Sequence, residues 1–250
     1  MQCCRLCLAL PDTKPTAKPN FVDPRFEREL LVNTKLIRQS DELANLPVGG
    51  FLKRSFDVFA AILALILLSP LFILLSCLVK LSDGGPVLYG HRRIGRGGNA
   101  FYCLKFRTMV TDGDAVLEAH FAANPEAHAE WLAARKLQVD PRVTTLGIVL
   151  RKLSLDELPQ LVNILRGEMS LVGPRPVVRD EIELYGSAAT YYFKSRPGLT
   201  GVWQISGRND VNYDERIAFD KHYVENWSFQ KDIIIILKTI PAVCASRGSY

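Results

Sequence analysis

The apolar run from Val58 to Val79 constrains the fold most, because its 22 residues carry no formal charge. A straight helix rises about 1.5 Å per residue, so this run would reach about 33 Å, enough to cross a hydrocarbon core of about 30 Å. Ser69 and Pro70 lie near its middle. Proline has no amide donor, and its ring clashes with the carbonyl of Ile66. The length therefore favours a membrane span, whereas the proline favours a break.

The charges on either side of this run favour a segment that enters the membrane and turns back. Lys53 and Arg54 precede the run, and Lys80 and three arginines follow it. Because both flanks are basic, neither resembles a translocated side. The Ser69 hydroxyl can satisfy a carbonyl that the break leaves free. We therefore expect a re-entrant helix–break–helix over residues 51–82 rather than a span, with Lys53 and Arg54 reaching phosphate head groups.

The charge balance and the cysteines narrow the class of protein. A net charge of +5 and a pI near 8.9 suit anionic partners such as lipid head groups or phosphorylated substrates. The sequence contains none of the recognised nucleic-acid motifs, so no nucleic-acid partner is expected. The six cysteines form no paired framework and no zinc-like spacing. They indicate incidental thiols in a reducing compartment.

The rest of the chain predicts a mixed α/β fold that is mainly helical. Residues 1–50 contain four prolines before the linker at 46–50 and indicate a flexible tail, with a short amphipathic helix near 25–38. Residues 90–109 alternate as a β-hairpin, and the glycines at 95–98 indicate its turn, with basic flanks. Residues 112–137 read as polar-faced helix interrupted at Pro125.

A second apolar stretch, "DIIIILKTIPAVCA" at 232–245, is too short to span a membrane. It fits a buried helix or strand, and it also fits an amphipathic helix lying on the bilayer. The expected organisation is a tail and linker over 1–50, a re-entrant anchor over 51–82 and a small cytoplasmic catalytic domain with amphipathic interfacial helices over 83–250.

The adjacent carboxylates Asp156 and Glu157 are the strongest chemical signal. They precede an amphipathic helix expected over 156–166. Two registers are open: Ser154 as the N-cap of a capping box with Glu157, or Asp156 as the N-cap with Pro159 at the third position. Acidic residues often decorate a helix start, so the pair alone also fits a purely structural role.

The surroundings of the pair favour chemistry, because several cations flank it in the sequence and two more lie on the expected hairpin. Carboxylates beside Arg and Lys side chains at a helix start can hold phosphates and a divalent cation together. One carboxylate can bind Mg²⁺ while its neighbour attacks phosphorus, which splits a transfer into two steps. The cations are Lys105, Arg107, Arg151, Lys152, Arg166 and Arg175.

A series of motifs resembles the bacterial sugar transferase family, whose members are monotopic phosphoglycosyl transferases. The resemblance covers residues 51–250, about four fifths of the chain, in order. The motifs are "KRSFD" (53–57), "LLSPLF" (67–72), "KFRTM" (105–109), "DPRVTTLG" (140–147), "LRKLSLDELPQL" (150–161), "MSLVGPRP" (169–176), "RPGLTGVWQISGR" (196–208) and "RGSY" (247–250).

The resemblance implies transfer of hexose-1-phosphate from a UDP-sugar to undecaprenyl phosphate, with release of UMP, as the first membrane step of exopolysaccharide synthesis. It implies that Asp156 forms a covalent phosphosugar intermediate and that Glu157 binds Mg²⁺. It also implies a site at the cytoplasmic face of the bacterial inner membrane and is compatible with a homodimer. The end of the chain most resembles galactosyl or glucosyl carriers, and we favour galactose.

Further roles follow from the same resemblance. Substrate-binding positions are Lys105, Arg107, Arg151 and Arg175, with Gln204 and Arg208 as nucleotide-sugar contacts or as parts of a structural loop; membrane positions are Lys53, Arg54, Ser69 and Pro70. The alternative from another class is a non-catalytic scaffold that binds polyprenyl phosphate.

Overall fold

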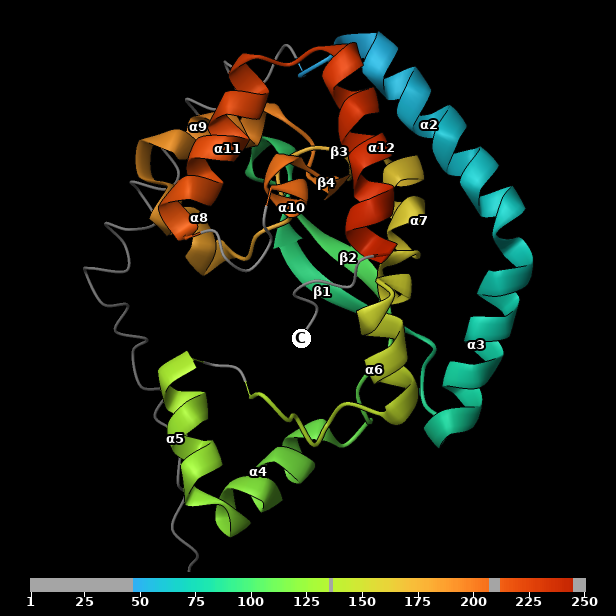
Figure 1. Cartoon of the computed structure of the whole chain (residues 1–250), viewed down its shortest axis with the longest axis vertical. Coiled ribbons are helices and arrows are strands. Elements are labelled where there is room, and N and C mark those ends of the chain that lie inside the picture. Colours follow the sequence, from blue (N-terminus) through green and yellow to red (C-terminus); the bar gives the residue numbers. More distant parts are fainter. Residues whose placement is uncertain (1–46, 135–136, 207–211, 245–250) are drawn as a thin grey trace, which may run out of the picture. The chain divides into compact units, whose positions relative to one another are not determined.

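The computed structural model describes residues 47–134, 137–206 and 212–244. All of them belong to the second of the two units into which the chain divides, residues 37–250. The tail before residue 47, with the helix expected near 25–38, lies outside the described residues. So do Arg208 and the terminal "RGSY". Within the described residues the fold is mainly helical with two small sheets, which confirms the expected mixed class (Figure 1).

The apolar run forms two helices with a sharp bend between them, as Pro70 predicts. Helix α2 spans Gly50–Leu67 and helix α3 spans Ser69–Asp83, and their axes bend by 65° at the junction. Ser69 Oγ donates a 2.8 Å hydrogen bond to the carbonyl of Ile66, which loses its helical partner at Pro70. No single helix of the described residues is long and apolar enough to cross a membrane, although the bent pair together is.

The basic residues at the start of α2 pack inward, contrary to expectation. Lys53 is 4% exposed, and its Nζ lies 2.6 Å from Oδ2 of Asp232. Arg54 donates to the carbonyls of Ile164, at 2.6 Å, and Leu165, at 3.1 Å. The prediction that Lys53 faces head groups is wrong, because Lys53 is buried in an ion pair. Arg54 is partly exposed and caps the end of another helix.

Asp57, one helical turn after Lys53, also points inward. Its carboxylate accepts a 2.7 Å hydrogen bond from Ser170 Oγ and a 3.1 Å bond from the backbone N–H of Leu171. The charged residues of the "KRSFD" stretch thus fasten α2 to the rest of the protein. Further along, Ala61 of α2 enters the same apolar core as Phe101 and Met169.

A β-hairpin carries one wall of the candidate site. Strand β1 (Leu88–Ile94) pairs antiparallel with β2 (Ala100–Phe106), which confirms the predicted hairpin. Its turn contains the short 3-10 helix η1 (Arg96–Gly98), where Gly97 has φ 66° and Gly98 φ 77°. Only glycine adopts these angles without strain, so the glycines determine the turn.

The helices after the hairpin agree in part with the predicted pattern. The break at Pro125 is confirmed, because α4 (Gly113–Ala123) and α5 (Pro125–Ala134) meet there. The next elements lead to the carboxylate pair: α6 (Thr145–Lys152), η2 (Leu155–Glu157) and α7 (Gln160–Arg166). Strand β3 (Ser170–Val172) then pairs in parallel with β4 (Gly198–Thr200). The remaining elements are α8 (Arg179–Tyr185), η3 (Gly186–Ala188), α9 (Ala189–Lys194), α10 (Val202–Ile205), α11 (Tyr213–Glu225) and α12 (Phe229–Cys244).

Helix α12 contains the second apolar stretch and has two different faces. Asp232 and Ile235 are buried against the small parallel sheet and Tyr223. Ile234, Leu237 and Ile240 are 50%, 61% and 60% exposed. The buried alternative therefore holds for one face of this helix, and its other, apolar face is exposed. The start of α12 lies beside α2, where Phe229 packs against Phe56 (Figure 1).

Candidate active site

The carboxylates Asp156 and Glu157 sit on a tight turn and not at the start of a regular helix. Ser154 has φ 54°, the sole positive φ of a non-glycine side chain in the described part of the chain. The chain then forms the 3-10 turn η2, and α7 begins at Gln160 after Pro159. Neither predicted N-cap register is correct. Ser154 precedes η2 in a left-handed conformation without a side-chain cap hydrogen bond, and the residue before α7 is Pro159 and not Asp156. Such backbone conformations cluster at functional sites.

Lys105 of strand β2 joins the two carboxylates. Its Nζ lies 2.6 Å from Oε1 of Glu157 and 3.7 Å from Oδ2 of Asp156. The buried amide of Asn163 fixes this relationship, because it accepts from the N–H of Leu104 and donates to the carbonyl of Tyr102. Helix α7 and strand β2 are therefore locked together, with Lys105 held beside the turn.

Asp156 is the more enclosed of the two carboxylates: its side chain is 11% exposed, against 30% for Glu157. The pKa of Asp156 is raised, mainly because the carboxylate is buried. The Lys105 cation opposes this rise. Glu157 adds to the rise and Arg151 reduces it, both to a smaller extent. A poorly solvated carboxylate held ionised by cations is a good nucleophile, since little solvent must be removed before it attacks.

Arg151 and Thr108 support this arrangement. Arg151 lies in the last turn of α6, and its Nε donates a 2.9 Å hydrogen bond to Oγ1 of Thr108. Gly147 allows α6 to approach this closely, because a Cβ there would lie 2.1 Å from the carbonyl oxygen of Thr108. The charge of Arg151 is near enough to lower the pKa of Asp156, and its predicted role as a phosphate contact stays a prediction.

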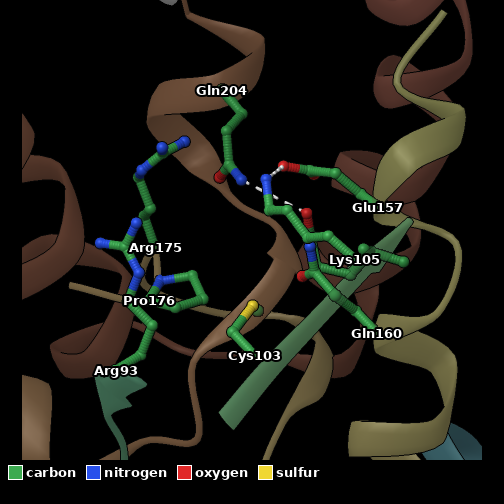
Figure 2. Close-up of a pocket in the computed structure, with 10 residues that line it drawn as sticks. Arg93, Cys103, Lys105, Glu157, Gln160, Arg175, Pro176 and Gln204 are labelled. Carbon is green, nitrogen blue, oxygen red and sulfur yellow. Dashed lines mark hydrogen bonds and ion pairs between the residues drawn. The ribbon is translucent and has the colours of Figure 1, made fainter. Parts of the chain in front are cut away.

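Two more cations lie across a narrow cleft from Lys105 and Glu157. Figure 2 shows Arg93 and Arg175 on the opposite wall, with Gln204 above them. The guanidinium of Arg175 stacks on Trp203, 5.4 Å from the ring centroid. This catalytic cleft is lined by Arg93, Cys103, Lys105, Glu157, Gln160, Arg175, Pro176, Gly198, Leu199 and Gln204.

The cleft is narrow between the described side chains. Its volume is about 20 Å³, little more than one water molecule needs. Gln204 lines it, and Gln204 Nε2 donates to the carbonyl of Leu199 at 3.3 Å.

The structure separates Arg107 from the predicted site. Strand β2 ends at Phe106, so Arg107 leaves the alternation that would have put it beside Lys105. It is 9% exposed, it pairs with Asp83 at the end of α3, and its Nη2 also donates to the carbonyl of Val79 at 3.3 Å. Arg107 joins α3 to the hairpin and does not line the cleft, contrary to the prediction that it contacts substrate beside Lys105.

Sequence reasoning missed Arg93, Cys103 and Gln160. The first two could have been found from the hairpin, because residues at alternate positions share a face and Arg93 is opposite Phe101 in the register. Cys103 and Lys105 lie on that same face. Gln160 stands inside the "DELPQL" motif and is 3% exposed. Its position in the cleft depends on the turn at Pro159, which the helical pattern did not indicate.

Magnesium is the cofactor that the carboxylate pair fits. Mg²⁺ prefers one or two carboxylates together with substrate phosphates and retained waters. Asp156 and Glu157 supply two adjacent carboxylates, and Glu157 is exposed enough to reach an ion in the cleft. No group of three His, Cys, Asp or Glu side chains suited to a metal occurs within residues 47–134, 137–206 and 212–244. A bound Mg²⁺ therefore needs oxygen ligands from the substrate as well.

Comparison with known proteins identifies relatives over most of the chain. A family model described as "Bacterial sugar transferase" matches residues 48–246. The exopolysaccharide production protein ExoY of Sinorhizobium fredii is 69% identical over 204 residues, covering 82% of this chain and 90% of that protein.

Two relatives with more specific names are also similar. The undecaprenyl-phosphate galactose phosphotransferase of Salmonella typhimurium is 52% identical over 86% of this chain, which spans 45% of that protein. The UDP-glucose:undecaprenyl-phosphate glucose-1-phosphate transferase of Caulobacter vibrioides is 38% identical over 84% of this chain and 79% of that protein.

Proposed function

Because the chain belongs to the bacterial sugar transferase family and is an enzyme that transfers hexose-1-phosphate, we propose that its donor is a UDP-hexose and its acceptor undecaprenyl phosphate. UMP is the second product. The reaction is the first membrane step of exopolysaccharide synthesis. The observation that carries this proposal is the buried carboxylate of Asp156, which lies 3.7 Å from the Lys105 cation and also feels the charge of Arg151.

The transfer proceeds in two steps through Asp156. In the first, a carboxylate oxygen of Asp156 attacks the phosphorus that bears the hexose. The bond from that phosphorus to the bridging oxygen breaks, and UMP leaves with this oxygen. In the second step, an oxygen of undecaprenyl phosphate attacks the same phosphorus and the carboxylate of Asp156 departs. The product is the undecaprenyl diphosphate sugar, and Asp156 is regenerated.

The cations of the cleft act on the charge of the transferring group. Lys105 keeps Asp156 ionised for attack and lies beside the position where the phosphoryl oxygens develop charge. Arg175, fixed on Trp203, can bind the donor diphosphate from the opposite wall, with Gln204 as a weaker contact. Glu157 would hold Mg²⁺. A bound Mg²⁺ would neutralise part of the negative charge of the diphosphate.

The bent pair α2–α3 is the membrane anchor in this proposal. Its exposed apolar residues include Phe59, Ile66 and Ile73, 64–68% exposed, which suit contact with acyl chains. The bend at Pro70 lets the pair dip into the bilayer and return, so that the chain on both sides stays at the cytoplasmic face of the inner membrane. The exposed face of α12 lies on the same bilayer. The enzyme is also proposed to act as a homodimer.

The hexose is proposed to be galactose, with glucose as the alternative. The galactose phosphotransferase of Salmonella typhimurium is more similar to this chain than the glucose-1-phosphate transferase of Caulobacter vibrioides, at 52% against 38% identity. A single change of hydroxyl orientation distinguishes the two sugars.

The test is a UMP-release assay with purified full chain, Mg²⁺, undecaprenyl phosphate and a panel of UDP-sugars. UDP-galactose should give the highest kcat/KM, UDP-glucose a lower one and N-acetylated sugars the lowest. Asp156→Asn should abolish release while the protein stays folded. If wild type releases no UMP with any donor but still binds undecaprenyl phosphate, the chain is a scaffold and the proposal fails.

A further inference from the structure

A second pocket lies beside the turn of the β-hairpin and contains three arginines. Arg96 comes from the turn itself, Arg166 from the last residue of α7 and Arg196 from the segment before β4. The pocket has a volume of about 560 Å³, within the range of small-molecule sites. We call it the arginine pocket.

The arginine pocket is separate from the catalytic cleft. No residue lines both. Phe101 of the arginine pocket and Lys105 of the cleft lie four residues apart on strand β2, about 13 Å along an extended strand. A ligand in the arginine pocket would therefore not touch the carboxylate of Asp156.

Contacts with the end of α7 determine the position of the Arg196 guanidinium, which lines this pocket, and of the Arg54 guanidinium, which lies next to it. Arg196 Nε donates a 2.9 Å hydrogen bond to the carbonyl of Gly167, which lines the pocket. Arg54 donates to the carbonyls of Ile164 and Leu165, and its Nη2 would lie 3.6 Å from a Cβ on Gly167. Cations suit a helix C-terminus, so these two contacts are explained by capping.

Two further arginines bring positive charge to the same pocket. Arg96 and Arg166 line it from different elements, the hairpin turn and the end of α7. The pKa of Arg196 is lowered by burial and then by the nearby charges of Arg96 and Arg54. The one acidic lining residue, Glu168, accepts a 2.6 Å hydrogen bond from Asn163. An anion in the pocket would relieve the repulsion among the arginines.

We propose that the arginine pocket binds a phosphate group, supplied in the membrane by the head group of an anionic phospholipid. Guanidinium groups bind phosphate oxygens in pairs of parallel hydrogen bonds, and three can surround one phosphate. The choice of a lipid rests on the proposed membrane anchor. Arg54, which lies next to Gly167 of the pocket, is on α2 between the exposed apolar residues Leu52 and Phe59. The pocket therefore lies beside the helix that the proposed anchor puts against the bilayer.

The test uses native mass spectrometry of the detergent-solubilised full chain. Phosphatidylglycerol and phosphatidylcholine are added in separate arms, and inorganic phosphate in a third. The wild type should retain phosphatidylglycerol roughly tenfold better than phosphatidylcholine, and Arg96→Gln with Arg166→Gln should remove this preference. The control, Arg92→Gln with Arg179→Gln, removes the same charge from exposed positions outside the pocket and should keep the preference.

The remaining outcomes each decide something. If inorganic phosphate binds the wild type but not the pocket variant, the pocket is a phosphate site. If inorganic phosphate also displaces phosphatidylglycerol, the ligand is free phosphate and not a lipid head group. Equal retention of both lipids by the wild type, with no phosphate bound, overturns the proposal. UMP release in detergent should be the same in the pocket variant and the control. A raised KM for undecaprenyl phosphate in the pocket variant alone would assign the pocket to the acceptor and contradict a separate site. The inference rests on the proposed function for its membrane setting, but lipid retention is measured without turnover. Its result can therefore be interpreted even if the transferase proposal fails.

Discussion

The Nζ atom of Lys105 lies 3.7 Å from Oδ2 of Asp156, although the two residues come from a β-strand and a 3-10 turn. This ion pair counteracts the burial of Asp156, which by itself favours the neutral acid. The enzyme needs a carboxylate that is poorly solvated and still ionised. Lys105 is the largest influence that keeps Asp156 charged, so the pair connects the fold directly with the proposed chemistry.

Replacement of Lys105 should change the pH dependence of turnover. The attacking form of Asp156 is ionised, so kcat/KM falls as the pH drops through its pKa. Lys105→Gln removes a cation that lowers this pKa; the pKa rises, and the acid limb of the profile should move to higher pH. The maximal rate should also drop roughly tenfold or more. The measurement is UMP release across a pH series.

Two variants serve as controls for Lys105. Lys105→Arg keeps a charge and should return the acid limb most of the way to its wild-type position. Arg151→Gln should move the limb in the same direction but less, since Arg151 has a smaller influence on the pKa of Asp156. An acid limb that does not move in Lys105→Gln would contradict the assigned role.

The buried ion pair between Lys53 of α2 and Asp232 of α12 should contribute strongly to the free energy of unfolding. Lys53→Met leaves the carboxylate of Asp232 buried without its cation, which costs about 3–5 kcal/mol. The Tm in detergent should fall by roughly 10 °C. Lys53→Met combined with Asp232→Asn should be less destabilised, because no buried charge is left without its counter-ion. The amide oxygen can still accept from Trp227 Nε1, and the Tyr223 hydroxyl, which can donate to the carbonyl of Val172, can accept from the amide N–H. If Lys53 instead faced head groups, the single variant would keep its Tm and bind vesicles more weakly.

Asp220 should make the protein less stable as the pH rises. Burial raises its pKa from 3.8 to about 7, while the hydrogen bond from Tyr185 and the charge of Arg175 lower it. Because the folded pKa exceeds the unfolded one, the stability from its protonated form is complete below about pH 4 and is lost as the pH rises through about 7. Asp220→Asn should therefore gain Tm relative to the wild type between pH 5 and 8. Asp214→Asn, an exposed change on the same helix, should show no such trend.

Arg175 and Arg107 should respond differently to the same substitution. Arg175 lines the catalytic cleft, so Arg175→Gln should raise the KM for the UDP-sugar roughly tenfold with little change in Tm. Arg107 is buried against Asp83, so Arg107→Gln should lower the Tm and leave the KM of the remaining folded enzyme unchanged. If Arg107→Gln raised the KM as much as Arg175→Gln does, Arg107 would have to be a substrate contact after all.

The features predicted correctly depend on neighbours in the chain. Pro70 breaks the apolar run, Pro125 separates two helices, and the alternation at 90–106 forms a hairpin, because each follows from local backbone chemistry. The adjacency of Asp156 and Glu157 also needs only the sequence. Their exact turn did not follow, because the left-handed backbone of Ser154 depends on how α6 and α7 pack around it.

The features that were missed or wrong depend on distant contacts. Lys53 meets Asp232 across 179 positions, and Asp57 meets Ser170 across 113, so no local pattern could show that the start of α2 is buried. Arg107 follows Lys105 by two residues and was predicted to share its role. The end of β2 at Phe106 sends it to Asp83 instead.

The central claim is that Asp156 becomes covalently attached to the hexose phosphate, and intact-protein mass spectrometry tests it most directly. Wild-type enzyme incubated with Mg²⁺ and UDP-galactose, without undecaprenyl phosphate, should gain the mass of one hexose phosphate while releasing one equivalent of UMP. The modified peptide should contain Asp156, and addition of undecaprenyl phosphate should remove the group. Asp156→Asn should remain unmodified. UMP release that requires the lipid acceptor, with no adduct on rapidly quenched wild-type enzyme, would contradict the claim and indicate direct attack by the lipid phosphate.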